Sequence, residues 1–198
     1  MFVVKLIFKQ NVINHARCLE YLLKRQEEIK LCDMSAQYGA INCLKFAHKH
    51  KYTWDENTCG KAAYYGYLNL KYLHDNGCPW NENTCSFASK NGQLDCLKYA
   101  HNKGCPWDER TCAYAAENGH LDCLMFAHNE GCLWDKETCS MASKNGYLNC
   151  LMFAHNEGCP WDEETCYNAV TNGHLNCLMY AHTHGCQWGV IDSFMKLC

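Results

Sequence analysis

Tryptophan recurs along this chain at a nearly constant interval. Successive tryptophans are separated by 26, 27, 27, 27 and 27 residues. A fixed period of this size is typical of one small supersecondary unit copied end to end, in which each copy buries its apolar face only against its neighbours. We therefore expect function on an extended surface, because no single repeat has the depth to enclose a reaction. The six positions are Trp54, Trp80, Trp107, Trp134, Trp161 and Trp188.

The charge and hydropathy of the chain give no sign that it binds nucleic acid or a membrane. The formal net charge is -3 at pH 7, with nine Lys and Arg against four Asp and Glu in residues 1–51 and nine against seventeen in residues 52–198. Nucleic-acid binding usually needs a clustered basic stripe, and neither part contains a run of like charge. No stretch approaches the roughly 20 apolar residues of a membrane span. We expect neither a nucleic-acid nor a membrane partner.

Eighteen cysteines raise the question of compartment. In a short secreted protein this number would suggest a disulfide framework. The apolar start at residues 1–8 is interrupted by Lys5 and closed by Lys9, and no small-residue cleavage site of a signal peptide comes after it. The expectation is an intracellular, cytoplasmic protein with reduced thiols.

The repeat that begins at Asp108 shows its secondary structure most clearly. Asp108 is suited to cap a helix, and apolar residues at helical spacing predict a first helix over 109–118. A second helix is expected from residue 120 or 121 to 130, and Gly119 and Gly131 are expected to end the two helices. Because the linkers are too short for a pair of strands, the predicted fold is all-α, an α-solenoid of stacked antiparallel helix pairs.

Each tryptophan directly precedes a helix cap or stands at the end of the array. Trp107 lies before Asp108 and five residues before Cys112, which is the spacing of a hydrophobic staple. We expect the indole to pack on the first helical turn and to fix the angle at which each repeat enters. The tryptophans are therefore interpreted as structural residues.

The repeat pattern divides the chain into three parts. Residues 1–27 match a repeat without its first helix and are expected to form an N-terminal capping half-repeat. Residues 28–188 hold six repeats of about 27 residues, and residues 189–198 are expected to form a closing segment. One repeat has lost a residue, and the loop at 65–68 is expected to absorb the slip, because such a deletion inside a helix rotates the residues after it by about 100°.

The centre of the repeat resembles that of a known family. The run A-A-x-x-G-H-L-D from Ala115 to Asp122 is similar to the helix-turn-helix centre of the ankyrin repeat, A-A-x-x-G-H-x-E. The longer motif G-H-L-x-C-L-x-[FY]-A-H-x-x-G-C-P-W-D-x-x-T-C resembles the short, 27-residue, Cys/His/Trp-rich ankyrin-like repeats of giant DNA viruses and some protists. The resemblance covers roughly residues 14–192.

This resemblance implies an ankyrin-like solenoid without the long β-hairpin loops, and a protein that binds another protein. If the chain is viral, the expected location is the cytoplasm of the host cell. Such repeats are often joined to an N-terminal F-box that recruits ubiquitin-ligase machinery, so a substrate adaptor of a ubiquitin ligase is an alternative function. Residues 1–30 lack the Leu-Pro start of an F-box and fit a capping half-repeat better.

Cysteine and histidine recur at fixed places in the repeats. Antiparallel helices are expected to bring His128, Cys132 and Cys112 together, and such a cluster could hold zinc, so a zinc-binding or zinc-stabilised repeat protein is a second alternative. The array offers about three ligands per repeat rather than four. We interpret the cysteines as small buried hydrophobes and the histidine as bound to a backbone carbonyl, and we expect no metal and no cofactor.

The sequence contains no catalytic signature. There is no phosphate-binding glycine loop, no H-E-x-x-H motif and no single cysteine set apart with a unique histidine. Every reactive residue type is copied into nearly every repeat, whereas catalysis needs unlike groups that converge once. We expect a non-enzymatic protein without a small-molecule substrate.

Positions that vary between repeats are the candidate binding residues. The position two residues after the helix-one cysteine points away from the core stripe, so its large side chains are predicted to be exposed. Phe87, Tyr114 and Met141 would then form an apolar row, which is typical of an interaction site. The expected partner is an intracellular protein. The candidate partner-binding residues are Met34, Lys61, Phe87, Tyr114, Met141 and Asn168.

Overall fold

A computed structural model describes residues 31–66 and 69–187 of the chain, and every regular element within them is an α-helix. The helices occur in pairs, and we refer to the first and second helix of each pair as helix one and helix two. The pairs are α3 (Leu31–Gln37) with α4 (Ile41–Lys49), α5 (Glu56–Tyr64) with α6 (Asn69–Asp75), α7 (Glu82–Lys90) with α8 (Leu94–Asn102), α9 (Arg110–Glu117) with α10 (Leu121–Asn129), α11 (Lys136–Lys144) with α12 (Leu148–Asn156), and α13 (Glu163–Thr171) with α14 (Leu175–Thr183).

The described helices confirm the predicted fold class. The two helices expected over 109–118 and 120–130 are found at Arg110–Glu117 and Leu121–Asn129. The described residues contain six helix pairs within the interval in which six repeats are predicted. The expected capping half-repeat at 1–27 and the closing segment at 189–198 lie outside the described residues.

Aspartate side chains cap the helix-one N-termini as their sequence position predicts. The first backbone N–H groups of a helix have no partner within it, and a carboxylate before the helix can accept from them. Asp135 accepts from the N–H of Glu137 at 3.0 Å, and Asp162 accepts from the N–H of Glu164 at the same distance. In the repeat at Asp108 the helix begins one residue later, yet the Asp108 carboxylate still accepts from the N–H of Arg110 at 3.2 Å.

Glycine ends both helices of the repeat in the left-handed backbone region. Gly119 has φ +73° and Gly131 has φ +85°. A side chain at these angles is strained, so glycine is favoured. The first described repeat shows the exception, because Lys51 occupies the place of the second glycine at φ 61°.

The core of each pair is built from small residues on helix one and from leucine and alanine on helix two. Cys112, Ala115 and Ala116 of α9 are fully buried, as are Leu124 and Ala127 of α10. The distance between packed helices depends on the side chains at the contact, and small residues allow a close approach. The buried stripe is the one that the spacing of the sequence predicts.

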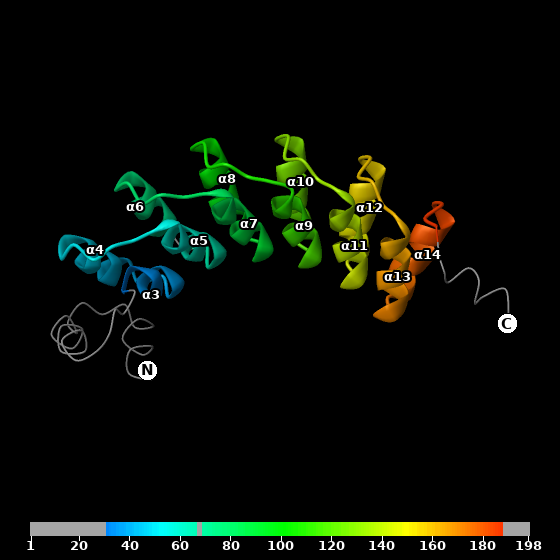
Figure 1. The fold of residues 1–198 in the computed structure, drawn as a ribbon, viewed down its shortest axis with the longest axis horizontal. Coiled ribbons are helices and arrows are strands. Elements are labelled where there is room, and N and C mark those ends of the chain that lie inside the picture. The colour runs from blue at the N-terminus through cyan, green and yellow to red at the C-terminus, as the bar shows by residue number, and fades with distance from the viewer. Residues whose placement is uncertain (1–30, 67–68, 188–198) are drawn as a thin grey trace. The chain divides into compact units, whose positions relative to one another are not determined.

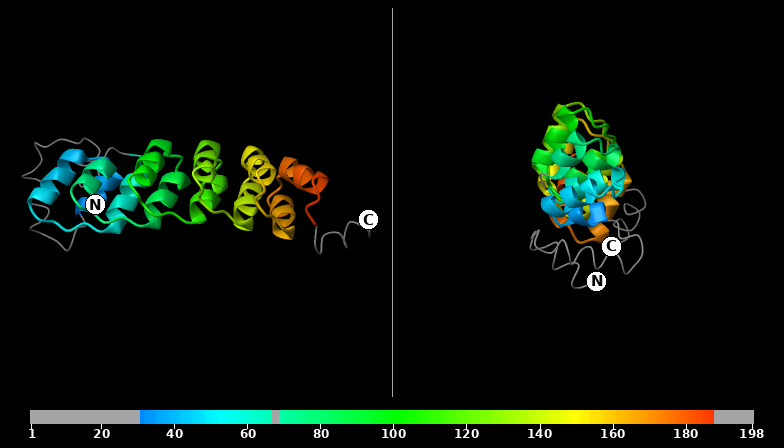
Figure 2. Two further views of the ribbon diagram at one scale, coloured as in Figure 1. Left: turned by 90° about the horizontal axis from the view of Figure 1, so that it is seen from above. Right: turned by 90° about the vertical axis from the view of Figure 1, so that its left-hand side faces the viewer.

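The helix pairs fall into two compact units. Among the described residues, one unit extends to Ala88 and includes Asp95–Pro106, and the other includes Ser89–Leu94 and extends from Trp107 onward. In unit 1, α3 packs against α4 and α5. In unit 2, α11 packs between α9 and α13, while α12 contacts α10 and α14. Helix one thus stacks on helix one and helix two on helix two within a unit (Figures 1 and 2).

The shortened repeat regains its register by the start of α6. This helix has 7 residues, whereas α4, α8, α10, α12 and α14 have 9 each. Asn69 occupies the buried place of a helix-two cysteine, and its side-chain amide donates to the carbonyl of Ser35 at 3.3 Å. Leu70 and Leu73 are fully buried like their equivalents in the described repeats before α14. Of the loop expected to absorb the slip, residues 67 and 68 lie outside the described residues.

Candidate partner-binding surfaces

The six predicted partner-binding residues lie on helix one, but their side chains are half-buried rather than exposed. They are therefore less exposed than their helical phase predicts. The residue that precedes each of them is buried in all described repeats but the last, where Tyr167 is exposed. The reason is visible within unit 1, where Phe87 lies against Gly60 of the preceding repeat. Lys61 and Phe87 both pack against the repeat before them, and only part of each side chain is accessible to solvent.

Lys61 forms an ion pair with a residue of the preceding repeat. Its ammonium lies 2.7 Å from a carboxylate oxygen of Asp33, which is 4 % exposed. The hydroxyl of Thr58 also donates to this carboxylate. Breaking a buried ion pair leaves an uncompensated charge and is costly. Lys61 therefore has a structural role between α3 and α5 in addition to any contact with a partner.

Phe87 and Tyr114, the aromatic members of the set, are half-buried, and neighbouring groups contact their rings. The Phe87 ring meets the Tyr64 ring edge-on, with centroids 6.5 Å apart. A Cβ atom on Gly60 would lie 3.1 Å from Phe87, so the glycine provides the space for this ring. The Tyr114 ring has the ammonium of Lys90 4.6 Å from its centroid, a cation–π contact.

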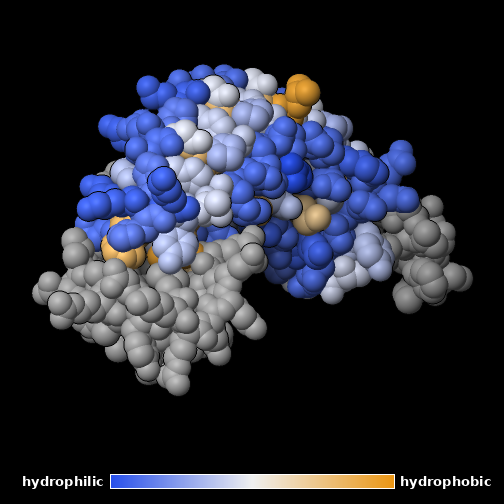
Figure 3. All heavy atoms as spheres, turned by 60° about the vertical axis from the view of Figure 1, so that its left-hand side comes forward, coloured by the Kyte–Doolittle hydropathy of each residue, from blue (hydrophilic) through white to orange (hydrophobic). Residues whose placement is uncertain are grey.

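A second row of exposed side chains lies on helix two, at positions that the sequence pattern alone did not mark as a surface. Met125, Met152 and Met179, which we call the methionine row, occupy one position in α10, α12 and α14 and are 40 %, 37 % and 57 % exposed. Hydrophilic side chains cover most of the face in Figure 3, and the few hydrophobic residues on it stand out. The equivalent position in the first three repeats holds exposed lysines, at Lys45, Lys71 and Lys98.

The repeated histidine and tryptophan form a contact between neighbouring repeats. In unit 2 the His128 ring stacks on Trp134 with centroids 3.9 Å apart, and Phe153 of the next repeat meets both rings edge-on. At two described junctions the next repeat has a tyrosine whose hydroxyl also binds the histidine. His48 Nδ1 lies 2.9 Å from the Tyr72 hydroxyl, and His155 Nδ1 lies 3.0 Å from the Tyr180 hydroxyl. At His48 and His155, a side chain of the next repeat thus takes the place of the expected backbone-carbonyl partner.

Trp161 also has the environment of the predicted hydrophobic staple. It packs against a buried cluster of Cys166, Ala181 and Cys186, and Cys166 is the residue five positions after it. The indole is therefore shared between His155 of its own repeat and the first helical turn of the next repeat. Its position inside a repeating contact supports the structural interpretation of the tryptophans.

The cysteine after helix two, present in every described repeat but the first, joins the end of its repeat to the start through a hydrogen bond. Cys132 Sγ donates to the carbonyl of Asp108 at 3.2 Å, and Cys159 Sγ donates to the carbonyl of Asp135 at the same distance. A hydrogen bond with Cys132 and burial raise the pKa of the Cys112 thiol, which disfavours the thiolate that zinc requires. No group of three or more His, Cys, Asp and Glu within the described residues has a metal-binding arrangement.

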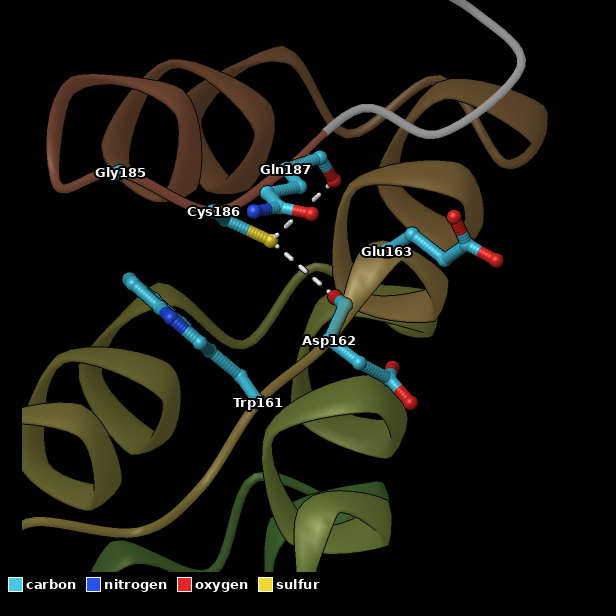
Figure 4. A pocket seen from close by; sticks show the side chains of 6 residues that line it. All are labelled: Trp161, Asp162, Glu163, Gly185, Cys186 and Gln187. Atoms are coloured by element: carbon cyan, nitrogen blue, oxygen red, sulfur yellow. Dashed lines mark hydrogen bonds between the residues drawn. The ribbon is translucent and has the colours of Figure 1, made fainter.

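A hollow at the last described repeat contains only groups of this recurring motif. Figure 4 shows the Cys186 sulfur between the carbonyls of Asp162 and Gln187, at 3.1 and 3.8 Å. The Asp162 carboxylate is bound by the Lys136 ammonium at 2.6 Å. It is lined by Trp161, Asp162, Glu163, Gly185, Cys186 and Gln187.

The helices of the described residues show no membrane-spanning segment. None of them is both long and apolar enough to cross a bilayer.

Comparison with known proteins identifies the fold. No protein-family model and no curated protein sequence matches the chain. Among solved structures, the crystal structure of the human ASB11 ankyrin repeat domain is similar, with a TM-score of 0.64 and 13 % sequence identity over 79 % of this chain and 84 % of that one. At this level of identity the likeness shows the fold alone, which is the ankyrin-repeat solenoid of stacked helix pairs.

Proposed function

We propose that this chain is a non-enzymatic ankyrin-like scaffold that binds an intracellular protein through the candidate partner-binding residues of helix one. One observation carries the proposal. The residues that repeat are buried in contacts within and between repeats, whereas the position that changes keeps part of a large side chain at the surface. Selection for the fold explains the first set, and recognition explains the second.

The chemistry of unit 2 suits a polypeptide ligand. Tyr114, Met141 and Asn168 lie on α9, α11 and α13, and α11 contacts both of the other helices. They offer a phenol, a thioether and an amide on adjoining helices, beside polar side chains such as Glu117 and Lys144. Aromatic rings and methionine with a polar surround are typical of protein interfaces. The described thiols and imidazoles are engaged in structural contacts, which supports a non-enzymatic role.

Neither alternative function gains support from a specific contact. The recurring thiols donate to backbone carbonyls, as Cys132 does to Asp108, and this argues against a zinc-dependent repeat. The ubiquitin-ligase adaptor depends on residues 1–30, which lie outside the described residues. The finer assignment to the short Cys/His/Trp-rich repeats of giant viruses and protists, with the host cytoplasm as location, rests on the 27-residue sequence motif.

A matched pair of variants tests the binding face. Phe87→Asn, Tyr114→Asn and Met141→Asn together introduce the residue that Asn168 already supplies at this position, so the fold is expected to be retained. Tagged wild type and variant are each incubated with host-cell lysate, and captured proteins are quantified by mass spectrometry. A specific partner should be lost with the variant.

The control carries three substitutions on helix two, in the methionine row, and should retain the same partner. Equal capture by the wild type and the helix-one variant, with circular dichroism spectra that match, would refute the proposed face.

A further inference from the structure

The methionine row is not required by the fold. Each of its members comes directly after a buried helix-two leucine, or in α14 a half-buried one, and points away from the helix pair. The same position holds lysine in the first three repeats, so an apolar side chain is not needed there for stacking. Three exposed apolar side chains in one register on successive helices differ from singly scattered ones, because one partner can contact all three.

The spacing of the row matches the repeat of an α-helix. Within unit 2, α12 contacts both α10 and α14, and packed helices have axes about 8–10 Å apart. Seven residues of an α-helix rise about 10.5 Å. A helix that lies across α10, α12 and α14 therefore brings a side chain over each methionine at positions i, i+7 and i+14. Methionine is suited to such a surface, because its unbranched side chain adapts to different partners.

The charged residues on and directly after the helices that carry the row favour a basic occupant. We call Asp122, Glu130 and Glu157 the acidic rim, because each is exposed and lies on or directly after α10 or α12. The helices α10, α12 and α14 contain neither lysine nor arginine. The Glu157 carboxylate lies 3.9 Å from His128 Nε2 and is itself about half exposed, so it can accept from a further basic group. A complementary partner carries positive charge beside its apolar stripe.

We propose that α10, α12 and α14 bind a basic amphipathic helix of another protein. Its apolar side chains, seven residues apart, pack on the methionine row, and its lysine and arginine side chains face the acidic rim. This surface lies on helix two and is separate from the helix-one residues of the proposed function. The two surfaces can therefore be tested independently.

The test uses the full chain and fluorescent synthetic peptides of about 18 residues, long enough for three anchors at helical spacing. The first peptide has leucine at i, i+7 and i+14 with lysine and arginine beside them. The second has the same leucines with glutamate in place of the basic residues. Fluorescence anisotropy is expected to show binding of the basic peptide that weakens with salt, and binding of the acidic peptide about tenfold weaker or more.

The protein variant combines Met125→Lys, Met152→Lys and Met179→Lys, and introduces the residue native to this position in the other repeats. It should bind the basic peptide at least about tenfold more weakly while its circular dichroism is unchanged. The three single variants should each show part of the loss, which keeps the test informative if the triple variant is unstable. The helix-one variant with asparagine at 87, 114 and 141 should bind the peptide like the wild type.

Three results would overturn the proposal. One is undiminished binding by the methionine-row variant, and another is equal binding of the two peptides. The third is self-association of the wild type in sedimentation velocity that the variant abolishes, because the occupant would then be a second copy of this chain. Loss of the lysate partner from the helix-one variant with peptide binding intact would support both surfaces, and failure of peptide binding alone would refute only this one.

Discussion

Replacing Gly119 by alanine tests how tightly one repeat covers the next. A Cβ atom at Gly119 would lie 2.9 Å from Cγ of Tyr147 in the next repeat, and still closer to other atoms of that ring. Gly131, in the same repeat, has a similar backbone conformation, but no described atom lies within 4 Å of the place that its Cβ would take. The two glycines therefore share the backbone strain of a side chain and differ in the packing that it meets.

Two effects set the magnitudes. A non-glycine residue in the left-handed region costs about 1–2 kcal/mol, and this cost should lower the free energy of unfolding of both variants. Forcing an extra methyl group into a filled space costs about 1–3 kcal/mol, and this second cost should apply to Gly119→Ala alone. We expect Gly119→Ala to reduce the free energy of unfolding by about 2–5 kcal/mol and Gly131→Ala by about 1–2 kcal/mol.

The assay is urea unfolding monitored by circular dichroism, with a double-mutant cycle through Tyr147→Ala. Removing the ring should make Gly119→Ala as mild as Gly131→Ala, with a coupling free energy of about 1–3 kcal/mol. Equal losses for the two glycine variants in the wild-type background would refute the idea that the ring limits this position. A difference that persists without the ring would refute it too.

Three further predictions concern acid, thiols and metal. Burial and the nearby His184 lower the pKa of His155, so the unfolded chain binds more protons as the pH falls through the ordinary value of 6.5. The free energy of unfolding should decrease there until the pH is below the lowered pKa, and His155→Gln should reduce this slope in urea titrations at several pH values. Burial raises the pKa of Cys96 and Cys150 to about 11, and all the described cysteines are buried. Ellman's reagent should therefore react with the described thiols slowly in the native protein and fast in denaturant, and rapid native reaction would contradict their burial. Elemental analysis should find far less than one zinc per chain, and a chelator should leave the thermal unfolding curve unchanged, whereas a lowered midpoint would show that metal supports the fold.

The helices could be predicted from sequence because their signals are local. Asp108 before the helix and Gly119 after it define α9 to within a residue or so, and the spacing of Leu124 and Ala127 identifies the buried stripe of α10. Each signal acts over one or two turns. Because the same local signals recur in each repeat, the helices predicted for one repeat also predict the architecture of the array.

The burial of the candidate binding residues could not be predicted in the same way. Helical phase places Phe87 and Lys61 away from the core of their own pair, but their burial comes from the repeat before them. The contact between Lys61 and Asp33 joins residues in different repeats, and only the stacking geometry brings them together. The tyrosine partner of His155 was missed for the same reason.

The methionine row was present in the sequence but hidden within the most regular part of the motif. The cysteine and leucine of helix two recur so regularly that the pattern indicates a structural element, and the position after the leucine does not stand out. Comparison of Lys98 with Met125 down the aligned repeats would have revealed the change from lysine to methionine. Only the exposed fraction of the side chains shows that this change alters a surface.

The stacked His–Trp contact allows whole repeats to be added to or removed from the array. A repeat supplies the histidine and tryptophan, as His128 and Trp134 do, and the next repeat supplies the aromatic ring, as Phe153 does. The junctions within the described residues join the same two kinds of contact surface. Unequal recombination that adds or removes whole repeats therefore creates a junction that already fits. The length of this protein, and with it the number of variable positions, can change in evolution in single steps without an unstable intermediate.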